Sequence, residues 1–353
     1  MKTEQEILQS LEAIDQKGDL KNIKRSVKIL YLELDSLAAP DFNEPPIREL
    51  YYIIGQLTQI IEAQTHERAA YYLNRLKKSL TIQKTSPIND INLNRWKEYG
   101  HILTDSLWML GKREKPNTNT AWYWGNFVPD IPSQLITRYT KKGEYVLDPF
   151  AGSGTTLFEA RNLGRNCVGV DINQEVVDRV NVQLATSDNP WFSHDPGQSG
   201  LVHLAQGDSC DLNVIEGALQ TAGTMKAQLA ILHPPYWDII KFNDKADDLS
   251  NAEDLDEFLR MFDMIVSNVH TVLDNDRYMA IVIGDKYADG ELIPLGFHCM
   301  QIALQNNFKL KSIVVKNYDN TKGKQGQEEL WRYRALVGGF YVFKHEYIFV
   351  FQK

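Results

Sequence analysis

Cysteine is scarce in this sequence. Three cysteines occur in 353 residues, Cys167, Cys210 and Cys299, and they are far apart with no Cys-x-x-Cys pair. The odd number argues against a disulfide framework, and the missing pair argues against a structural zinc site. We therefore expect three small, buried apolar side chains and no bound metal.

Long apolar runs are also missing. No segment reaches the roughly 20 apolar residues that cross a bilayer. The N-terminal MKTEQEILQS lacks the basic-then-apolar pattern of a secretory signal. Hydrophobic residues make up 43% and charged residues 24%, as is usual for a soluble globular protein. These features predict a cytoplasmic protein with no membrane partner.

The sequence also has no excess of basic residues. The formal net charge is −8 at pH 7, whereas proteins that bind nucleic acid usually carry a basic surface. The composition therefore gives no support for nucleic-acid binding, and any positive surface must be local. The length suits a catalytic domain with an accessory part.

The first 111 residues are predicted to be a helical domain. Apolar residues recur there at helical spacing, with breaks near Gly18, Pro45 and Pro87, and a third helical stretch is predicted over residues 91–110. Residues 112–121 are polar and are predicted to be a linker. The nearly balanced charge of the helices favours a homodimer interface over phosphate contact, and DNA recognition is the alternative.

From residue 122 to 353, short apolar runs alternate with segments of helical period. This alternation predicts an α/β domain with a mostly parallel sheet and crossover helices. The last two runs are close together, which predicts an antiparallel hairpin at the end of the sheet. The predicted strands are residues 145–147, 167–170, 201–205, 229–232, 278–283, 310–315, 336–343 and 347–351.

The most specific local signal is the string EYVLDPFAGSGTT, residues 144–156. A predicted strand ends in Asp148, and Gly152 and Gly154 let the backbone approach a ligand closely because neither carries a Cβ. The helix that begins near Thr155 presents free N–H groups. A strand, a glycine turn and a helix in this order indicate a cofactor-binding loop.

Two further acidic residues follow the next predicted strands. Asp171 ends the strand in CVGVDIN, where one carboxylate can accept from both hydroxyls of a ribose. Asp208 follows the third strand and can accept from an adenine amino group; a helix N-cap or a loop turn explains it equally well. Acids at three successive strand ends favour a nucleotide-like cofactor at that edge of the sheet.

The fourth strand leads into HPPYW, residues 233–237. Pro234 and Pro235 have no N–H groups, so this rigid loop offers carbonyl acceptors. The ring of Tyr236 follows directly. This arrangement suits a flat group that carries an amine, which stacks on the ring while a carbonyl accepts from its N–H. A proline-rich turn with a packed aromatic ring is the structural alternative.

DPFAGSGTT, GVDIN and HPPYW together resemble the motifs of DNA amino-methyltransferases, which act on N6 of adenine or N4 of cytosine. The resemblance covers residues 122–353. It implies a Rossmann-like class I methyltransferase with a seven-stranded, mostly parallel sheet that ends in an antiparallel hairpin. It also implies the cofactor S-adenosylmethionine and the product S-adenosylhomocysteine. The cofactor-binding residues implied by the resemblance are Phe127, Asp148, Phe150, Gly152, Gly154, Thr155, Thr156, Asp171, Ile172 and Asp208.

The resemblance assigns catalysis to His233, Pro234, Pro235 and Tyr236. In the family the first residue, usually Asp, Asn or Ser, accepts from the target amine together with a proline carbonyl, and the aromatic ring stacks on a base flipped out of the duplex. His233 departs from that pattern. A neutral imidazole accepts one hydrogen bond and a protonated one accepts none, so activity should fall at low pH. Alternatively, His233 marks a changed substrate or a lost activity.

The resemblance predicts a site-specific DNA methyltransferase, with DNA as partner and a restriction enzyme as a possible second one. An RNA methyltransferase of the tRNA guanine-N2 type and a non-catalytic cofactor- or DNA-binding scaffold are the alternatives. Residues 237–250 and 316–334 mix basic and aromatic residues, which suits phosphate contact and base stacking. The predicted nucleic-acid contacts are Trp237, Lys241, Lys322, Lys324, Arg332 and Arg334.

Overall fold

The computed structural model describes residues 3–14, 19–37, 48–110, 123, 125, 128–185, 199–288, 290–317 and 328–353. The chain forms two compact units, residues 1–102 and 103–353. The predicted linker, residues 112–121, lies outside the described residues. Residues 103–110, which we assigned to the helical domain, belong to the second unit, because Leu107 and Trp108 pair with a strand of its sheet.

The N-terminal unit is built from helices around one apolar core. The stripe of Ile and Leu residues seen in the sequence is buried between the helices, with Leu11, Ile23 and Leu57 fully inaccessible. Thr3 and Glu6 form a capping box that satisfies the first N–H groups of the chain's first helix. The helices are α1 (Glu4–Glu12), α2 (Leu20–Leu37), α3 (Arg48–Glu62) and α4 (His66–Thr81).

The prediction of a helix over residues 91–110 is wrong. Only a 3-10 helix, η1 (Leu93–Tyr99), forms there, and Arg95 within it has non-helical backbone angles. The Arg95 side chain is held by carboxylates from two places, Glu98 nearby and Glu4 of α1. These contacts fix an irregular backbone that apolar spacing alone does not reveal.

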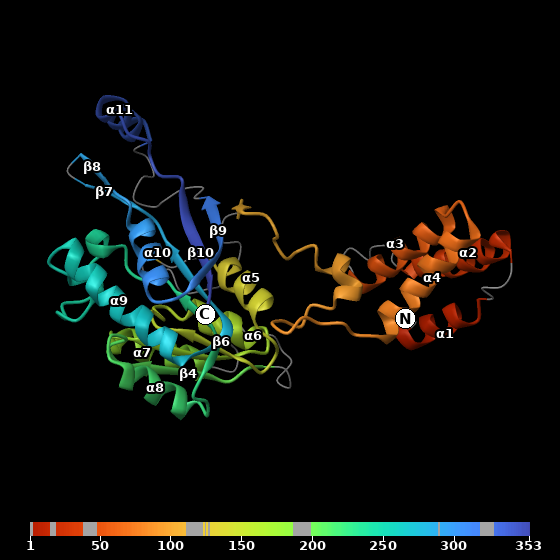
Figure 1. The fold of residues 1–353 in the computed structure, drawn as a ribbon, viewed down its shortest axis with the longest axis horizontal. Helices are drawn as coiled ribbons and strands as arrows, with labels where there is room; N and C mark the ends of the chain where they lie inside the picture. The colour runs from red at the N-terminus through yellow and green to blue at the C-terminus, as the bar shows by residue number, and fades with distance from the viewer. Residues whose placement is uncertain are drawn as a thin grey trace. The chain divides into compact units, whose positions relative to one another are not determined.

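The second unit is an α/β domain, as predicted (Figure 1). Among the described residues, eight strands form one sheet in the order β1-β9-β10-β6-β5-β2-β3-β4. The five strands from β4 to β6 run parallel, and β10 is antiparallel to both β6 and β9. The strands are β1 (Leu107–Trp108), β2 (Tyr145–Asp148), β3 (Asn166–Asp171), β4 (Val202–Gln206), β5 (Ala227–Leu232), β6 (Leu273–Ile283), β9 (Lys309–Asn317) and β10 (His345–Gln352).

The end of the sheet differs from the prediction in two ways. Residues 336–343 are not a strand: they include the end of helix α11 (Glu328–Gly338) and the loop that follows it. Leu336 and Val337 are exposed there rather than buried, so an apolar run was mistaken for a sheet strand. The antiparallel pair consists instead of β9 and β10, and the two-residue β1 adds an eighth strand beyond β9.

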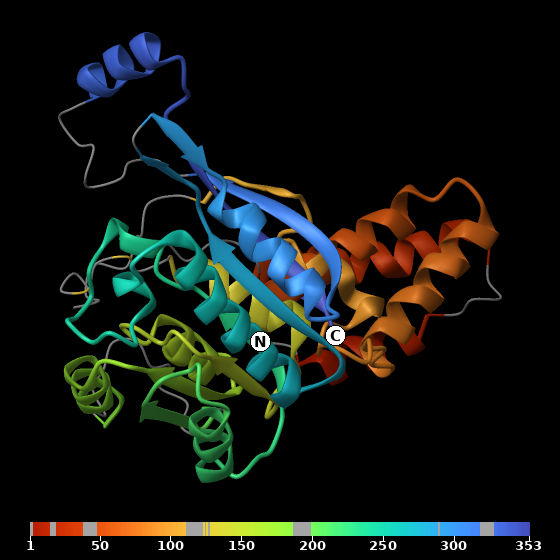
Figure 2. The same ribbon diagram turned by 60° about the vertical axis from the view of Figure 1, so that its left-hand side comes forward.

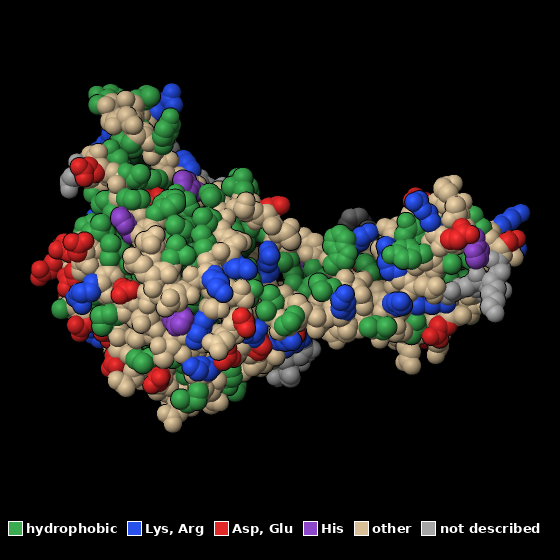
Figure 3. Space-filling model, viewed as in Figure 1, with side chains coloured by type: hydrophobic (Ala, Val, Ile, Leu, Met, Phe, Trp, Pro, Cys, Tyr) green, Lys and Arg blue, Asp and Glu red, His purple; other side chains and the backbone are tan. Residues whose placement is uncertain are grey.

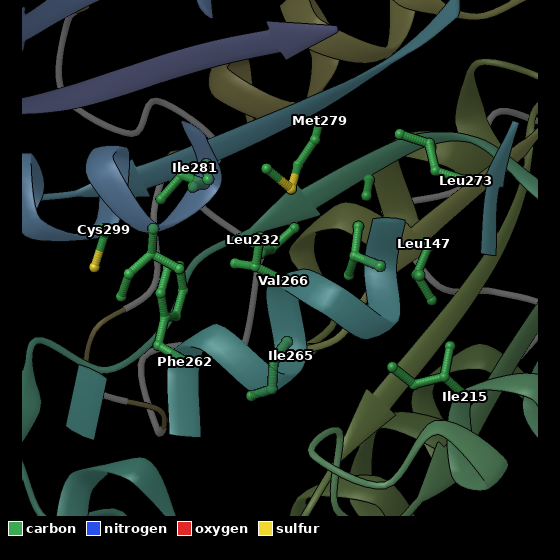
Figure 4. Packing of buried hydrophobic residues seen from close by; sticks show 14 of the residues in the cluster. Leu147, Ile215, Leu232, Phe262, Ile265, Val266, Leu273, Met279, Ile281 and Cys299 are labelled. Atoms are coloured by element: carbon green, nitrogen blue, oxygen red, sulfur yellow. The ribbon is translucent and has the colours of Figure 1, made fainter. Parts of the chain in front are cut away.

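Helices cover both faces of the sheet (Figure 2). On one face α9 contributes Phe262, Ile265 and Val266 to a core shared with Leu232 and Met279 of the sheet (Figure 4). Cys167 and Cys299 are buried as expected, whereas Cys210 is half-buried. The helices on that face are α8 (Leu212–Thr221), α9 (Leu255–Val272) and α10 (Leu295–Gln305), and those on the other are α5 (Asp130–Tyr139), α6 (Thr155–Asn162) and α7 (Gln174–Ala185).

Gly154 to Ala should destabilise the second unit by about 2–4 kcal/mol. Gly154 has φ +80°, and an added Cβ would lie 2.9 Å from Cγ1 of Val180. Gly143 to Ala is the matched control, because Gly143 has φ +78° with nothing within 4 Å of the added Cβ. The free energy of unfolding of that variant should fall only by the cost of placing alanine in the left-handed conformation, about 1–2 kcal/mol. Urea denaturation measures both, and equal losses would contradict the packing argument.

Candidate functional site

The loops that follow β2, β3 and β4 are joined by hydrogen bonds at the carboxyl edge of the sheet. Ala151 N donates to the Val170 carbonyl at 3.0 Å, and Gly207 N donates to the Asp171 carbonyl at 3.0 Å. The Ser209 hydroxyl donates to the Pro149 carbonyl at 2.8 Å. The three acids predicted at strand ends therefore follow strands whose loops are tied together. Open α/β sheets bind ligands at this edge.

The glycine loop has two residues in the left-handed region of backbone conformation. Gly152 has φ +49°, and its N–H donates to Oδ2 of Asp171 at 2.7 Å. Gly154 is the N-cap of α6 in the left-handed conformation, and Thr155 and Thr156 form the buried first turn. Phe150 packs against the core of the sheet. Backbone N–H groups at the start of α6 thus face the same edge as Asp171.

Asp148 and Asp171 are buried carboxyl groups that form no ion pair within the described part of the chain. Burial raises the pKa of Asp148 to about 7, against hydrogen bonds that lower it. Burial raises the pKa of Asp171 to about 6, although Asn173 N and Gly152 N donate to the carboxylate. Such groups are suited to accept hydrogen bonds from a ligand's hydroxyls or to face its positive charge.

Asp208 and Ile172 lie in the neighbouring loops. Asp208 is half-buried, and Oδ1 accepts from Cys210 N at 2.8 Å. It does not cap α8, since Asp211 is the N-cap of that helix. The carbonyl of Ile172 accepts from Nζ of Lys245 at 2.6 Å. The loop after the HPPY motif therefore reaches back to the end of β3.

Tyr123 is a site residue that the sequence interpretation missed. A Cβ on Gly152 would lie 3.0 Å from its ring, and the ring stacks on Phe242 with centroids 5.5 Å apart. Burial and the charges of Asp171, Asp248 and Asp148 raise its pKa. The available signal was the aromatic run WYWGNF, residues 122–127, just before the helix that precedes the glycine loop. The predicted Phe127 lies outside the described residues.

The HPPY residues follow β5, which is the parallel neighbour of β2. His233 and the glycine loop therefore lie at the same edge. Pro234 is buried, whereas His233, Pro235 and Tyr236 are half-buried. Burial lowers the pKa of His233 to about 4; Glu346 raises it and Lys316 lowers it further. The imidazole is therefore neutral at physiological pH, the form that accepts a hydrogen bond.

The predicted nucleic-acid contacts are only partly exposed. Trp237 is half-buried: its indole N–H donates to the Ala252 carbonyl at 3.2 Å, and Nζ of Lys286 lies 3.9 Å from the ring centroid. Lys241 is 61% exposed and pairs with Asp244 at 2.8 Å. Lys322 and Lys324 lie outside the described residues. Lys316, which begins the predicted basic loop, is a buried residue of β9 and not a surface contact.

Arg332 and Arg334 are exposed on α11, which connects β9 to β10. Because β10 begins opposite the end of β6, this connection leaves the sheet at the carboxyl edge. Figure 3 shows hydrophobic and basic side chains together on the projection that Figure 1 labels α11. The exposed apolar and aromatic residues of the helix and the loop after it are Leu330, Tyr333, Leu336, Val337 and Tyr341.

Within the described ranges, no helix combines the length and apolar character needed to cross a membrane. The same residues contain no group of three or more His, Cys, Asp or Glu side chains able to hold a metal ion.

Parts of this chain are similar in sequence to known proteins. The N6_N4_Mtase family, described as DNA methylase, matches residues 57–182 and 227–353. The type II methyltransferase M.Cfr9I of Citrobacter freundii is 38% identical over 78 residues, 21% of this chain and 26% of that protein. The type II methyltransferase M2.DpnII of Streptococcus pneumoniae is 50% identical over 42 residues, 12% of this chain and 16% of that protein. The matches thus span 26% or less of these relatives.

A solved structure of SAM-dependent methyltransferases from Methanosarcina mazei is also similar. It has a TM-score of 0.40 and 12% identity, over 62% of this chain and 96% of that one.

Proposed function

The chain belongs to the N6_N4_Mtase family of DNA methylases, and from this premise we propose that it methylates the exocyclic amine of a DNA base, N6 of adenine or N4 of cytosine. The proposal rests on the observation that two motifs lie at the same edge of the sheet. DPFAGSGTT and HPPY follow β2 and β5, which are parallel neighbours in the sheet. A donor at the first motif and an amine at the second would therefore be close together.

The cofactor is S-adenosylmethionine, as the family implies. The buried carboxylates of Asp148 and Asp171 beside the glycine loop fit its hydroxyls and its positive charge. When bound, it supplies a methyl group on a sulfonium centre. Asp171 would accept from the ribose hydroxyls, and Asp208 would lie near the adenine. Gly152 and Gly154 take positive φ, and the Tyr123 ring and Val180 pack where a Cβ on these glycines would lie, so that the loop backbone itself would face the cofactor. Asp148 would add a carboxylate facing the cation.

The HPPY residues would hold the target base. The neutral imidazole of His233 and the carbonyl of Pro234 would accept from the amine, and the ring of Tyr236 would stack on the flipped base. Hydrogen bonds accepted from the amine increase the electron density on its nitrogen, which favours attack on a methyl group. Catalysis would then consist mainly of positioning, without a covalent intermediate on the protein.

DNA would approach over α11 and the loop after the HPPY motif. Arg332 and Arg334 of α11 would contact phosphates, and the exposed Tyr333 and Tyr341 offer rings for stacking. Lys241 would add a further basic contact. A homodimer through the N-terminal helices, a restriction partner, and the choice between adenine and cytosine stay predictions.

The test is methyl transfer from labelled S-adenosylmethionine to unmodified duplex DNA or to total tRNA, followed by digestion and identification of the labelled nucleoside. Label in N6-methyldeoxyadenosine or N4-methyldeoxycytidine is expected, and it would identify the base. Label in tRNA alone would contradict the proposal in favour of an RNA substrate. Bound cofactor with no label in either would contradict it in favour of a non-catalytic protein.

Binding of S-adenosylmethionine should weaken as the pH falls. The pKa values of Asp148 and Asp171 are about 7 and about 6, and a ligand's donors favour the ionised carboxylates. Binding is therefore strongest above about pH 7, and protonation of each carboxylate should reduce affinity by up to about tenfold per pH unit below its own pKa. Calorimetry with S-adenosylmethionine measures this. Asp171 to Asn should remove the dependence centred near pH 6, and constant affinity down to about pH 5 would contradict the assignment.

A further inference from the structure

A buried ion pair lies beside the HPPY loop. Lys316 and Glu346 stand directly opposite each other where β9 pairs with β10. Nζ of Lys316 is 3.0 Å from Oε1 of Glu346, and their side chains are only 8% and 4% exposed. Of the ion pairs between described residues, this is the most buried.

The other oxygen of this carboxylate reaches the HPPY loop. The Tyr236 hydroxyl donates to Oε2 of Glu346 at 2.8 Å, across 110 positions of sequence. The ring of His233 meets the ring of Tyr236 edge to face, with centroids 5.9 Å apart and planes at 89°. The Tyr236 ring is thus held at its hydroxyl by β10 and at its side by His233.

Stability is a poor explanation for the pair. Taking two charges out of water is unfavourable, and replacing a buried ion pair by apolar residues often leaves stability unchanged or raises it. The Tyr236 hydroxyl, in contrast, needs an acceptor where it is half-buried. A carboxylate fixed by a lysine on the adjacent strand is an acceptor in a well-defined place. The position matters because Tyr236 follows Pro234 and Pro235 directly.

We propose that Glu346 is a positioning residue that holds the Tyr236 ring in the orientation in which a flat base stacks on it. Lys316 compensates the buried charge of the Glu346 carboxylate, and the side-chain oxygen at position 346 fixes the phenol. The stacking of a base on the Tyr236 ring rests on the proposed function. The contacts between Lys316, Glu346 and Tyr236 are observed in the structure and do not depend on that function. Because ring orientation sets the place of the target amine, loosening it should lower kcat and leave donor affinity unchanged.

Two double variants distinguish the effect of the hydrogen-bond acceptor at position 346 from the effect of the two charges. Lys316→Met with Glu346→Gln removes both charges but keeps an amide oxygen for the Tyr236 hydroxyl. Lys316→Met with Glu346→Leu removes the acceptor as well. We expect the Leu form and Tyr236→Phe each to lose about tenfold in kcat, and the Gln form to stay within about threefold of the wild type. Adding Tyr236→Phe to the Leu form should cause no further loss, because both remove one hydrogen bond.

Fluorine NMR of protein labelled with fluorotyrosine gives a readout that does not need methyl transfer. The Tyr236 resonance is identified by its loss in Tyr236→Phe. It should shift in the Leu form and stay near its wild-type position in the Gln form. An unmoved resonance in the Leu form, or additive losses of kcat, would overturn the positioning role. If the wild-type protein methylates no DNA but the Tyr236 resonance still shifts in the Leu form, the positioning role is supported and the proposed function is refuted.

Discussion

Replacing His233 with alanine should lower kcat for methyl transfer to DNA by about 10²- to 10³-fold, the loss typical of removing one hydrogen-bonding group from the reacting atoms. The imidazole follows β5 at the same edge of the sheet as the glycine loop. Affinity for S-adenosylmethionine should be unchanged, because the proposed donor contacts come from the loops after β2, β3 and β4. Steady-state kinetics with labelled donor and calorimetry measure the two quantities.

His233→Asn is the matched control, since its amide oxygen also accepts a hydrogen bond. We expect it to keep kcat within about tenfold of the wild type. The pH profile adds a second check: burial lowers the pKa of His233 to about 4, and only the neutral ring accepts. With saturating donor, kcat should therefore stay constant from neutral pH to about pH 5 and fall below that. An alanine variant with wild-type kcat would show that His233 takes no part in catalysis.

Asp171→Ala should weaken binding of S-adenosylmethionine by about 100-fold, which corresponds to about 2.7 kcal/mol. The side chain is proposed to accept from the ribose, and it also accepts from Gly152 N at 2.7 Å and Asn173 N at 2.9 Å. Its loss therefore removes a ligand contact and loosens the glycine loop. Isothermal calorimetry with S-adenosylmethionine and S-adenosylhomocysteine measures the effect.

Asp211→Ala is the control for this variant. Asp211 also lies in the loop after a neighbouring strand, but its carboxylate caps α8 by accepting from Asn213 N at 2.9 Å. That variant should lose about 1 kcal/mol of stability and keep donor affinity. Equal affinity for the donor in Asp171→Ala and the wild type would place the ribose elsewhere.

The local sequence was sufficient for the parts of the site that depend on short segments. The strand, glycine turn and helix around Gly152 and Gly154 are encoded within residues 144–156, and the positive φ angles follow from the glycines themselves. Alternation of apolar runs and helical segments was sufficient for the α/β class, because parallel strands need crossovers. Asp148, Asp171 and Asp208 could be placed at one edge for the same reason.

Contacts between distant segments were decided by the tertiary structure. Lys316 looked like the start of a basic loop, but the register of β9 with β10 places it opposite Glu346 inside the protein. The hydrogen bond from Tyr236 to Glu346 joins residues 110 positions apart, and no local pattern marks it. The sequence by itself therefore determined the fold class and the two motifs, since these follow from periodicity and backbone freedom. Only strand pairing and burial decided which charges meet, because both depend on segments far apart in the chain.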